Sequence, residues 1–280
     1  IVFGDWSSDV CSSDLPGQGL LRAVDGASAL FPSGGISAIV GPSGCGKTSL
    51  VHAVAGLLAP SAGEVLIDGE PVRGVRRRTA VIFQDYGLLP WRTVEGNAEL
   101  PLALAGMDKA SRKRRVEPVL DELGLSDFRH FHPGRLSGGM KQRVAIARAL
   151  AAEPDLLLMD EPFSSLDALT RETAQEFLLE VRRSRKLTIL VVTHSIEEAV
   201  YLAEAVFVMT GRNPGTISER FDIPENRANF RFARASLDGA SPQGAPPRQD
   251  FRAEPRYLQL CASIRSSLRG AGRTDDGSIR

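Results

Sequence analysis

The stretch that most directly predicts chemistry is GPSGCGKT, at residues 41–48. It matches G-x-x-x-x-G-K-[ST] in full, with an apolar run before it and a helical pattern after it, which is the context that a phosphate loop requires. Glycines allow successive backbone N–H groups to point at phosphate oxygens, and the start of the helix offers its positive dipole end to the same anion. We expect Lys47 to bridge the β- and γ-phosphates of a nucleotide and Thr48 to ligate Mg²⁺. The predicted nucleotide-binding residues are Gly41, Pro42, Ser43, Gly44, Cys45, Gly46, Lys47, Thr48 and Ser49.

Two adjacent carboxylates follow a second apolar run, in LLLMDEP at residues 156–162. Asp160 suits Mg²⁺, bound directly or through water, because this ion prefers hard oxygen ligands. Glu161 is placed to orient and polarise an attacking water molecule. Adjacent acidic residues are also common in the turns that follow strands, so the pair predicts catalysis only in combination with the phosphate loop.

Four short apolar runs are each followed at once by a residue that could act on phosphate. The runs are 36–40, 79–83, 156–159 and 187–193, and the residues that follow them are Gly41, Gln84, Asp160 with Glu161, and His194. Runs that are apolar throughout suit strands buried on both faces of a mostly parallel sheet. The carboxyl ends of such strands lie along one edge of the sheet, where open α/β folds bind ligands.

This placement predicts that Gln84 and His194 act on the γ-phosphate, with a solvated strand end and a structural histidine as the alternatives. Gln84 is also a predicted ligand of Mg²⁺, together with Thr48 and Asp160. His194 precedes SIEEAV, in which Ser195 is expected to cap a helix and Glu198 stands at the capping-box position.

Helical patterns alternate with the apolar runs, at about 47–58, 138–152, 168–185 and 195–203. Alternation of strands and helices along the chain predicts the α/β class. Pro118 interrupts a further helical pattern and predicts a helix start or a kink at that point.

A second candidate anion site lies in LSGGMKQR, at residues 136–143. Ser137, Gly138 and Gly139 stand at the predicted start of a helix, where small residues leave backbone N–H groups open to an anion. One nucleotide does not need two such sites in the same chain. We therefore expect this second site to serve the phosphate of a neighbouring molecule.

The composition excludes several classes of protein. Among 280 residues, 34 Lys and Arg balance 34 Asp and Glu, which argues against a dedicated nucleic-acid binder. With 42% hydrophobic and 24% charged residues, the chain is not globally disordered. No apolar run reaches the roughly 18 residues of a membrane span. Three cysteines make no disulfide framework and fit a reducing compartment.

The two ends of the chain are less informative than the middle. Residues 1–19 show no strand or helix period and repeat a Ser-Ser-Asp unit, so we interpret them as an atypical or artefactual N-terminus. Within 226–280, residues 239–250 are rich in Gly and Pro and are typical of a linker. A terminal amphipathic helix follows, which we expect to pack on the body rather than bind a partner, and 270–280 are expected to be disordered. Its apolar positions are Tyr257, Leu260, Cys261, Ile264 and Leu268.

With these motifs in this order, the chain resembles the ATP-binding cassette (ABC) ATPases over about residues 20–225. The motifs are GPSGCGKT as Walker A, Gln84 in the Q-loop, LSGGM as the signature, LLLMDEP as Walker B, SSLD at 164–167 as the D-loop, and His194 as the switch histidine. The resemblance implies a P-loop NTPase fold with a mostly parallel sheet, an inserted helical subdomain at about 90–150 and a short C-terminal helical tail.

The resemblance also implies a head-to-tail dimer with two ATP molecules between its subunits. Each ATP would contact Walker A of one copy and the signature residues Ser137, Gly138 and Gly139 of the other, while Asp167 would communicate across the dimer. The residues that would act on the bound ATP are Glu161, His194, Gln84 and Lys47.

Two stretches, 81–102 and 194–217, resemble the ATPases of nitrate, sulfonate, taurine and related importers. This implies an ATPase subunit on the cytoplasmic face of the inner membrane, working as a homodimer with transmembrane permease subunits and, indirectly, a periplasmic solute-binding protein. In that family a coupling helix of the membrane subunit docks near the Q-loop, so LLPW at 88–91 is either a contact for it or packing of the subdomain hinge. The basic run at 109–115 is expected to be a solvated helix face, with lipid headgroups as the alternative.

Two departures from the family pattern stand out. Asp14, Leu15 and Pro16 occupy the region where many cassettes carry an aromatic residue that stacks on adenine, and Ser195 stands where relatives often have Asp, a change that we expect to be tolerated. The rival functions are a non-transport ABC ATPase of translation or DNA maintenance, an unrelated P-loop NTPase and a pure binding module. A single cassette without sustained heptads disfavours the first rival, and LSGGM with SSLD disfavours the second.

Overall fold

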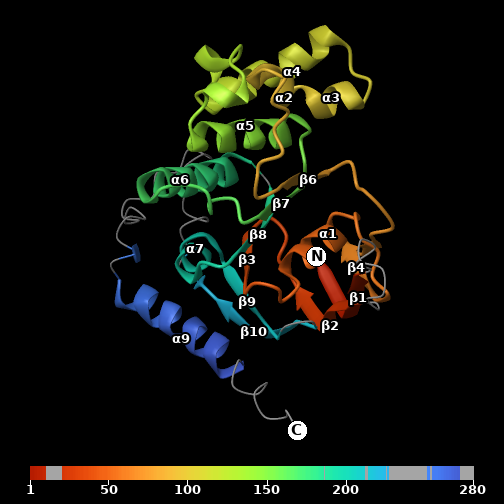
Figure 1. Cartoon of the computed structure of the whole chain (residues 1–280), viewed down its shortest axis with the longest axis vertical. Helices are drawn as coiled ribbons and strands as arrows, with labels where there is room; N and C mark the ends of the chain where they lie inside the picture. The colour runs from red at the N-terminus through yellow and green to blue at the C-terminus, as the bar shows by residue number, and fades with distance from the viewer. Residues whose placement is uncertain are drawn as a thin grey trace, which may run out of the picture. The chain divides into compact units, whose positions relative to one another are not determined.

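The computed structural model describes residues 1–10, 21–185, 187–211, 214–224, 226, 251–252 and 254–271, with its elements labelled in Figure 1. The chain divides into two compact units, and each is described separately: Ile1–Arg76 with Arg182–Arg280, and Arg77–Val181. The expected linker at 239–250 and the candidate adenine-contact region around residue 15 lie outside the described residues. Of the stretch 270–280, expected to be disordered, residues 270 and 271 belong to helix α9 (Pro255–Ala271), so the expectation is wrong there, and the rest lies outside the described residues.

The first unit contains four strands that pair in the order β10-β9-β3-β8. The parallel strand β3 lies between β8 and β9, with Ile36 opposite Ile189 and Ser37 opposite Ala205. Every residue of β3 and of β9 is buried, so the prediction of strands covered on both faces is confirmed for β3 and extends to β9. The bounds are Ile36–Val40 for β3, Thr188–Thr193 for β8, Ala205–Thr210 for β9 and Thr216–Asp222 for β10, which is antiparallel to β9.

A second, antiparallel sheet of the first unit pairs in the order β2-β1-β4-β5. Its strands are β1 (Val2–Val10), β2 (Leu21–Leu30), β4 (Ala62–Ile67) and β5 (Glu70–Pro71). The absence of a strand period in the first 19 residues was misleading, because β1 forms there. Its pairing with β2 shifts register three times between Phe3 and Asp9, and each shift resets the alternation that identifies a strand in sequence.

Three helices complete the described part of the first unit: α1 (Lys47–Val54), α7 (Ile196–Leu202) and α9 (Pro255–Ala271). The side chain of the buried Asn226 donates to the carbonyls of Val200 at 2.9 Å and Ala203 at 2.6 Å, which satisfies acceptors at the end of α7. The Tyr257 hydroxyl donates to the Glu197 carbonyl at 3.1 Å. The apolar pattern of α9 therefore faces the body, and its buried side chains are Tyr257, Leu260, Cys261 and Ile264.

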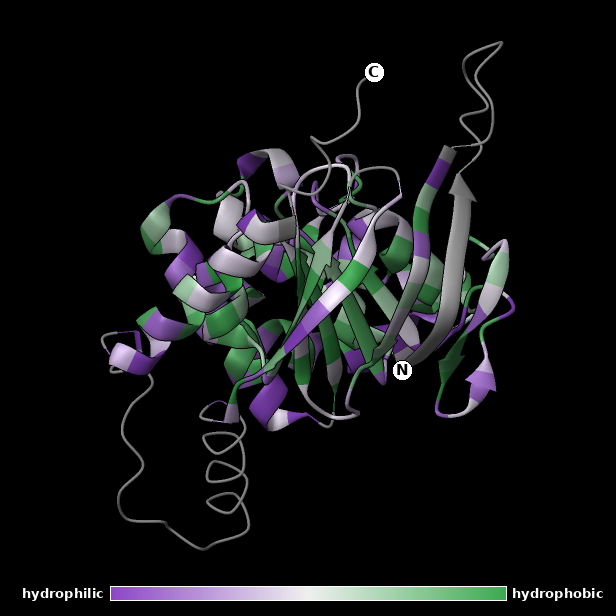
Figure 2. Ribbon diagram, turned by 90° about the horizontal axis from the view of Figure 1, so that it is seen from below, coloured by the Kyte–Doolittle hydropathy of each residue, from purple (hydrophilic) through white to green (hydrophobic). Residues whose placement is uncertain are grey.

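The second unit pairs β6 (Thr79–Ile82) with β7 (Leu156–Asp160) in parallel, Thr79 opposite Leu156. Helix α5 (Gly138–Ala151) packs against α2, α3, α4 and β6, and its buried face includes Val144, Ile146 and Leu150. In Figure 2 the hydrophobic residues concentrate on the strands and on the inner helix faces. The remaining helices are α2 (Val94–Ala98), α3 (Leu100–Leu104), α4 (Lys109–Glu122) and α6 (Ala168–Ser184), with the short turns η1 (Ser126–Phe128) and η2 (Pro133–Arg135).

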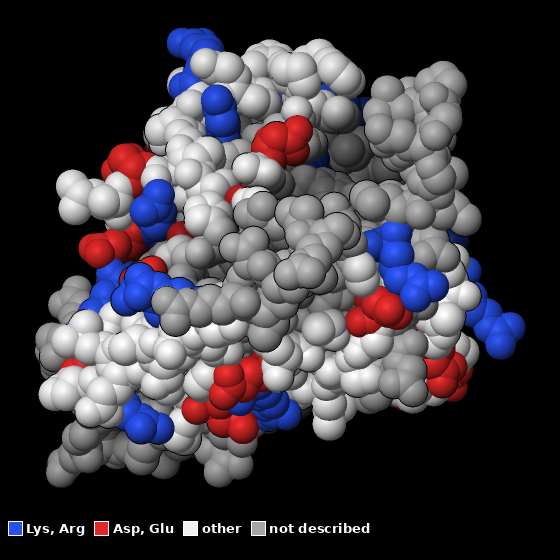
Figure 3. Space-filling model, turned by 60° about the horizontal axis from the view of Figure 1, so that its bottom comes forward, with Lys and Arg blue, Asp and Glu red and all other residues white. Residues whose placement is uncertain are grey.

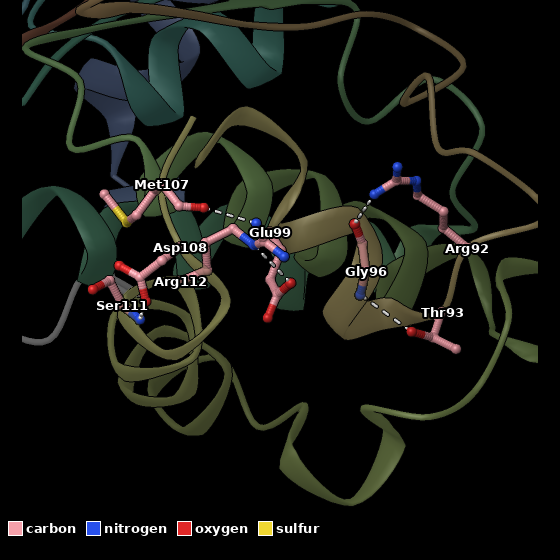
Figure 4. A network of polar contacts seen from close by, with 8 residues as sticks. All are labelled: Arg92, Thr93, Gly96, Glu99, Met107, Asp108, Ser111 and Arg112. Atoms are coloured by element: carbon pink, nitrogen blue, oxygen red, sulfur yellow. Dashed lines mark hydrogen bonds and ion pairs between the residues drawn. The ribbon is translucent and has the colours of Figure 1, made fainter. Parts of the chain in front are cut away.

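A polar network ties the first helices of the second unit together (Figure 4). The Thr93 hydroxyl caps α2 by accepting from the Gly96 N–H at 3.1 Å. Arg112 of α4 pairs with Glu99 at 3.2 Å and donates to the Met107 carbonyl at 2.8 Å. Because these side chains are partly buried, the ion pair is less screened by water than a surface pair.

Helix α4 begins earlier than Pro118 predicted. Asp108 caps it by accepting from the Ser111 N–H at 2.9 Å, and the helix then runs from Lys109 to Glu122 with Pro118 inside. The prediction of a helix start at Pro118 is therefore wrong. Proline removes one intrahelical hydrogen bond, but the buried side chains of Val116, Val119 and Leu120 on either side of it pack in the core and stabilise the continuous helix.

Asn97 fixes the segment that precedes α2. Its side chain is fully buried and accepts from the Leu89 N–H at 2.8 Å. The same amide group donates to the carbonyls of Leu89 and Arg92, each at 3.1 Å, and of Thr93 at 3.0 Å. One side chain thus takes the place of a regular secondary-structure ladder for residues 89–93.

Among the described residues, no helix has the length and apolar character that crossing a membrane requires.

Replacing Asn97 with alanine should lower the free energy of unfolding by about 2–4 kcal/mol, because several buried hydrogen bonds disappear and the Leu89 N–H loses its partner. Urea unfolding of the full chain measures this loss. Thr93→Ala, which removes only the cap of α2, is the matched control and should cost about 1 kcal/mol. Equal losses for the two variants would contradict the role given to Asn97.

Candidate active site

The phosphate loop, residues 41–48, leads from β3 into α1 in the first unit. Gly46 precedes α1 at φ 91°, in the left-handed region that glycine enters at little cost. A Cβ atom there would overlap Val24 Cγ2 and lie 2.7 Å from the Ala23 carbonyl oxygen. The loop is therefore pressed against β2, and residue 46 has to be glycine for reasons of both space and conformation.

Close contacts also surround the rest of the loop. A Cβ atom on Gly41 would lie 2.6 Å from the Met209 carbonyl oxygen and 2.8 Å from Cys45 Sγ. A Cβ atom on Gly215 would overlap the Cys45 carbonyl oxygen. Gly215 is itself bound to β2, because it donates to the Ala23 carbonyl at 3.0 Å and accepts from the Asp25 N–H at 2.9 Å. The back of the loop thus has no room for side chains.

Lys47 has a buried side chain that folds back over the loop. Its Nζ atom donates to the carbonyls of Gly41 at 2.9 Å and Pro42 at 2.8 Å. These bonds hold the ammonium against the backbone of the phosphate loop. Burial raises the pKa of the Cys45 thiol above its ordinary value, although the Lys47 charge acts in the opposite direction, so Cys45 is a packing residue rather than a nucleophile.

The open side of the loop faces solvent. Pro42, Ser43, Gly44 and Thr48 are exposed, whereas Gly41, Cys45 and Lys47 are buried. The exposed set borders the N-terminus of α1, whose first backbone N–H groups have no partners within the helix. This arrangement suits an anion, because the N-terminal end of the helix dipole and the Lys47 ammonium are both positive.

His194 is exposed at the end of β8 in the first unit, between two residues that share a hydrogen-bond network. The Thr193 hydroxyl donates to Glu198 Oε2 at 2.6 Å and accepts from the Ser195 N–H at 3.0 Å. Ser195 Oγ in turn accepts from the Glu198 N–H at 3.2 Å. The predicted N-cap at Ser195 is confirmed, but the reciprocal half of the capping box runs through Thr193, which sequence reasoning missed.

Gln84 is exposed in a tight turn directly after β6, in the second unit. The Tyr86 N–H closes the turn on the Phe83 carbonyl at 2.9 Å. The Gly87 N–H donates to Asp85 Oδ1 at 3.1 Å, which adds an Asx turn immediately afterwards. The structure therefore places Gln84 at a strand end, as expected.

Asp160 ends β7 in the same unit, Glu161 follows it in a turn, and the two lie in different environments. Asp160 is buried, with 7% of its surface exposed, and Glu161 is half-buried. Glu161 has φ 48°, in the left-handed region where side chains other than glycine are uncommon. Its carbonyl accepts from the Ser164 hydroxyl at 2.9 Å and from the Ser164 N–H at 3.2 Å, which fixes the turn.

The signature residues begin α5. Ser137 is the exposed N-cap, and its Oγ atom accepts from the Met140 N–H at 3.3 Å, which leaves the hydroxyl proton available for an anion. A Cβ atom on Gly138 would lie 2.9 Å from a methyl of Leu166, and one on Gly139 would lie 2.8 Å from a methyl of Thr170. Glycines therefore let the start of α5 pack against the D-loop and the start of α6.

Asp167 caps α6 next to the signature residues. Its Oδ1 atom accepts from the Thr170 N–H at 3.1 Å. The hydrogen bonds from Thr170 hold the pKa of this exposed carboxyl below its ordinary value. Two capped helix starts, one at Ser137 and one at Asp167, thus lie side by side in the second unit.

Charges of both signs are mixed on the molecule. On the face shown in Figure 3, Lys and Arg side chains alternate with Asp and Glu among the described residues. The described residues contain no group of three or more His, Cys, Asp and Glu that could hold a metal ion by itself.

Comparison with known proteins decides the family. A family model described as ABC transporter matches residues 24–164, the stretch from β2 through the phosphate loop, signature and Walker B. The chain belongs to the ABC transporter family. This cassette is 47% identical over 201 residues to TauB, a taurine import ATP-binding protein of Yersinia pestis bv. Antiqua (strain Antiqua), covering 72% of this chain and 78% of the relative. TauB of Rhizobium johnstonii is 43% identical over 233 residues, covering 83% and 88% of the two chains.

Solved structures of ABC cassettes share the fold. The dimeric structure of MJ0796, a bacterial ABC transporter cassette, matches this cassette with a TM-score of 0.68 at 28% identity, covering 79% of this chain and 97% of that one. A post-hydrolysis structure of MJ0796 bound to ADP and Pi matches with a TM-score of 0.67 at 29% identity. The predicted family, fold class and ATPase activity are confirmed, and the roles of individual residues stay predictions.

Each unit carries its own set of predicted residues. The first unit places the phosphate loop and His194 after β3 and β8, and the second places Gln84, the Asp160–Glu161 pair, and the signature with Asp167. Sequence reasoning missed four residues that support these sets: Thr193, Gly215, Tyr86 and Arg148. Gly215 gave one available signal, because the Pro-Gly pair at 214–215 is typical of a turn, a few residues after the apolar run of β9.

Gly215→Ala should weaken ATP binding about tenfold or more, because the new methyl group forces the Cys45 peptide out of place. Titration of the full chain with a fluorescent ATP analogue measures the affinity, and a thermal melt checks folding. Gly74→Ala is the matched control, since a Cβ atom at Gly74 meets nothing within 4 Å. Unchanged affinity in Gly215→Ala would refute the packing argument.

Proposed function

We propose that this chain hydrolyses ATP to power uptake of a small solute of the taurine, sulfonate or nitrate type through an ABC importer. The observation that carries the proposal is the pair of open helix starts, at the phosphate loop and at Ser137, in one chain. The names of the TauB relatives support the solute class. A non-transport ABC ATPase is not favoured by these relatives.

The proposed roles of the residues follow from their motifs, and their places at strand ends and helix starts support them. The phosphate loop binds the phosphates with its backbone N–H groups, and Lys47 neutralises charge between the β- and γ-phosphates. Glu161 orients and polarises the attacking water, while Gln84 and His194 contact the γ-phosphate. Most of the acceleration comes from positioning and charge neutralisation, because phosphoryl transfer requires little covalent chemistry from the protein.

The donor set fits Mg²⁺. We propose Thr48, Gln84 and Asp160 as its protein ligands, and each supplies a hard oxygen atom. In nucleotide sites this ion takes only one or two carboxylates and completes its shell with other oxygens, phosphates and water, so a cluster of carboxylates is not needed. When bound, Mg²⁺ supplies neutralisation of phosphate charge. The buried carboxylate of Asp160 is suited to this role because its interactions are less screened there.

Ser137 is proposed to act on the nucleotide of a second copy. Its cap bond uses an acceptor site of the hydroxyl and leaves the proton for a phosphate oxygen of that nucleotide. The MJ0796 cassette is dimeric, which supports the pairing of two copies, and the head-to-tail arrangement is part of the proposal. Asp167, which caps the neighbouring helix, would then communicate between the two copies.

The proposed transmembrane partners are permease subunits, with a periplasmic binding protein acting through them, at the cytoplasmic face of the inner membrane. Trp91 leaves 72% of its surface exposed in the segment that Asn97 fixes. A rigid segment that presents a large aromatic side chain favours a contact surface over hinge packing for LLPW. In the basic run of α4, Arg112, Lys113 and Arg115 pair with carboxylates, which favours the solvated face over lipid binding.

Glu161→Gln should keep ATP affinity and lower kcat about a hundredfold or more, because the amide cannot take up a proton from water. ATP hydrolysis then no longer separates the copies, so light scattering with ATP and Mg²⁺ should show a stable dimer. The wild-type chain without nucleotide is the reference. A variant that stays monomeric under these conditions would contradict the proposal that two copies share bound ATP.

Ser137→Arg should abolish turnover, because the bulky cation blocks the open start of α5. Binding of ATP to the phosphate loop of the same chain should stay within about twofold of wild type, a difference under 0.5 kcal/mol. Steady-state hydrolysis and a nucleotide titration measure the two effects. Full turnover in this variant would show that the signature does not contribute to catalysis.

A further inference from the structure

The backbone after Gln84 adopts an unusual conformation. Tyr86 has φ 62° and Gly87 has φ 53°, so two consecutive residues lie in the left-handed region. Glycine enters this region readily, whereas tyrosine does so only when its surroundings hold it there. The surroundings of Tyr86 therefore determine the shape of the turn that presents Gln84.

Arg148 on α5 holds this turn through hydrogen bonds to its backbone. Its guanidinium donates to the Gly87 carbonyl at 2.5 Å and to the Tyr86 carbonyl at 2.6 Å. Burial lowers the pKa of Arg148, with Asp85 acting in the opposite direction, yet a guanidinium stays charged at neutral pH. The planar fork of arginine suits two neighbouring carbonyls, which an ammonium group does not match.

The Tyr86 side chain grips the turn from the other side. Only 5% of its surface is exposed, and its hydroxyl forms hydrogen bonds with Ser165 Oγ at 3.0 Å and with the Pro162 carbonyl at 3.4 Å. Both partners lie between the Walker B acids and Asp167. Burial raises the pKa of Tyr86, so the hydroxyl keeps its proton at physiological pH.

We propose that Tyr86 and Arg148 are positioning residues for Gln84, linking it to the D-loop and to the signature helix. The proposal rests on the proposed function, in which Gln84 acts on ATP bound to its own chain while Ser137 and Asp167 act toward the second copy. Through Arg148, the turn of Gln84 is attached to the helix that Ser137 begins. Through Tyr86, it is attached to the loop that Asp167 ends.

These contacts connect the turn of Gln84 to α5 and to the D-loop within the second unit. A displacement of α5 or of the loop at 162–167 changes the anchors of the Tyr86–Gly87 peptide, and the Gln84 side chain moves with it. Gln84 therefore reaches the γ-phosphate in its working position only when the signature helix and the D-loop occupy theirs.

The test is a double-mutant cycle on ATP turnover by the full chain. Tyr86→Phe removes only the hydroxyl and should lower kcat about three- to tenfold, the range expected for one lost hydrogen bond, with ATP affinity unchanged. In a Gln84→Ala background the same change should have no further effect on kcat, because Tyr86 acts through Gln84. A purely structural role would lower kcat by the same factor in both backgrounds.

Arg148→Met tests the other anchor and should reproduce the loss of kcat. Arg115→Met is its matched control, because Arg115 pairs with Glu153 just beyond the far end of α5 and does not touch the turn. Thermal melts separate misfolding from mispositioning, and ligand titration separates binding from turnover. Unchanged kcat in Tyr86→Phe, or a full effect retained in Gln84→Ala, would overturn the proposal. Absence of ATP hydrolysis by the wild-type chain would instead refute the proposed function.

Discussion

The site depends on how tightly the back of the phosphate loop is packed. Gly41 and Gly46 leave no space for a side chain against β9 and β2, and Gly215 fits against the Cys45 carbonyl. With its back pressed on these strands, the loop leaves Pro42, Ser43, Gly44 and Thr48 exposed on its other side, next to the start of α1. Lys47 lies across the same backbone. Steric exclusion on one side thus creates anion affinity on the other.

Close packing made possible by glycine also occurs at the signature residues. Gly138 and Gly139 allow the start of α5 to approach Leu166 and Thr170, so two capped helix starts sit next to each other. In the proposed dimer, the polar groups that α5 leaves unpaired at its start would contact the nucleotide of the second copy. In the proposed reaction, small residues at helix starts therefore have two uses. They bind phosphate within one chain at the phosphate loop, and they bind phosphate between chains at the signature.

Local signals in the sequence were enough for the buried strands and the motif-bearing helices, because continuous apolar runs and helical periods survive in any context. They were not enough for β1, where register shifts erase the alternation, nor for Pro118, where packing outweighs helix propensity. The motif residues could be named from spacing. Tyr86 and Arg148 could not, because their importance comes from contacts between segments far apart in the chain, at sequence separations of 62 and 79 residues.

The left-handed backbone of Glu161 has a cost for the whole molecule. At φ 48° a side chain other than glycine destabilises the fold by about 1–2 kcal/mol, a sizeable part of the net stability of a domain. Glycine would relieve this strain but would remove the proposed catalytic base. Thermal stability and turnover therefore compete at this turn. Engineering for higher stability should keep Glu161 unchanged.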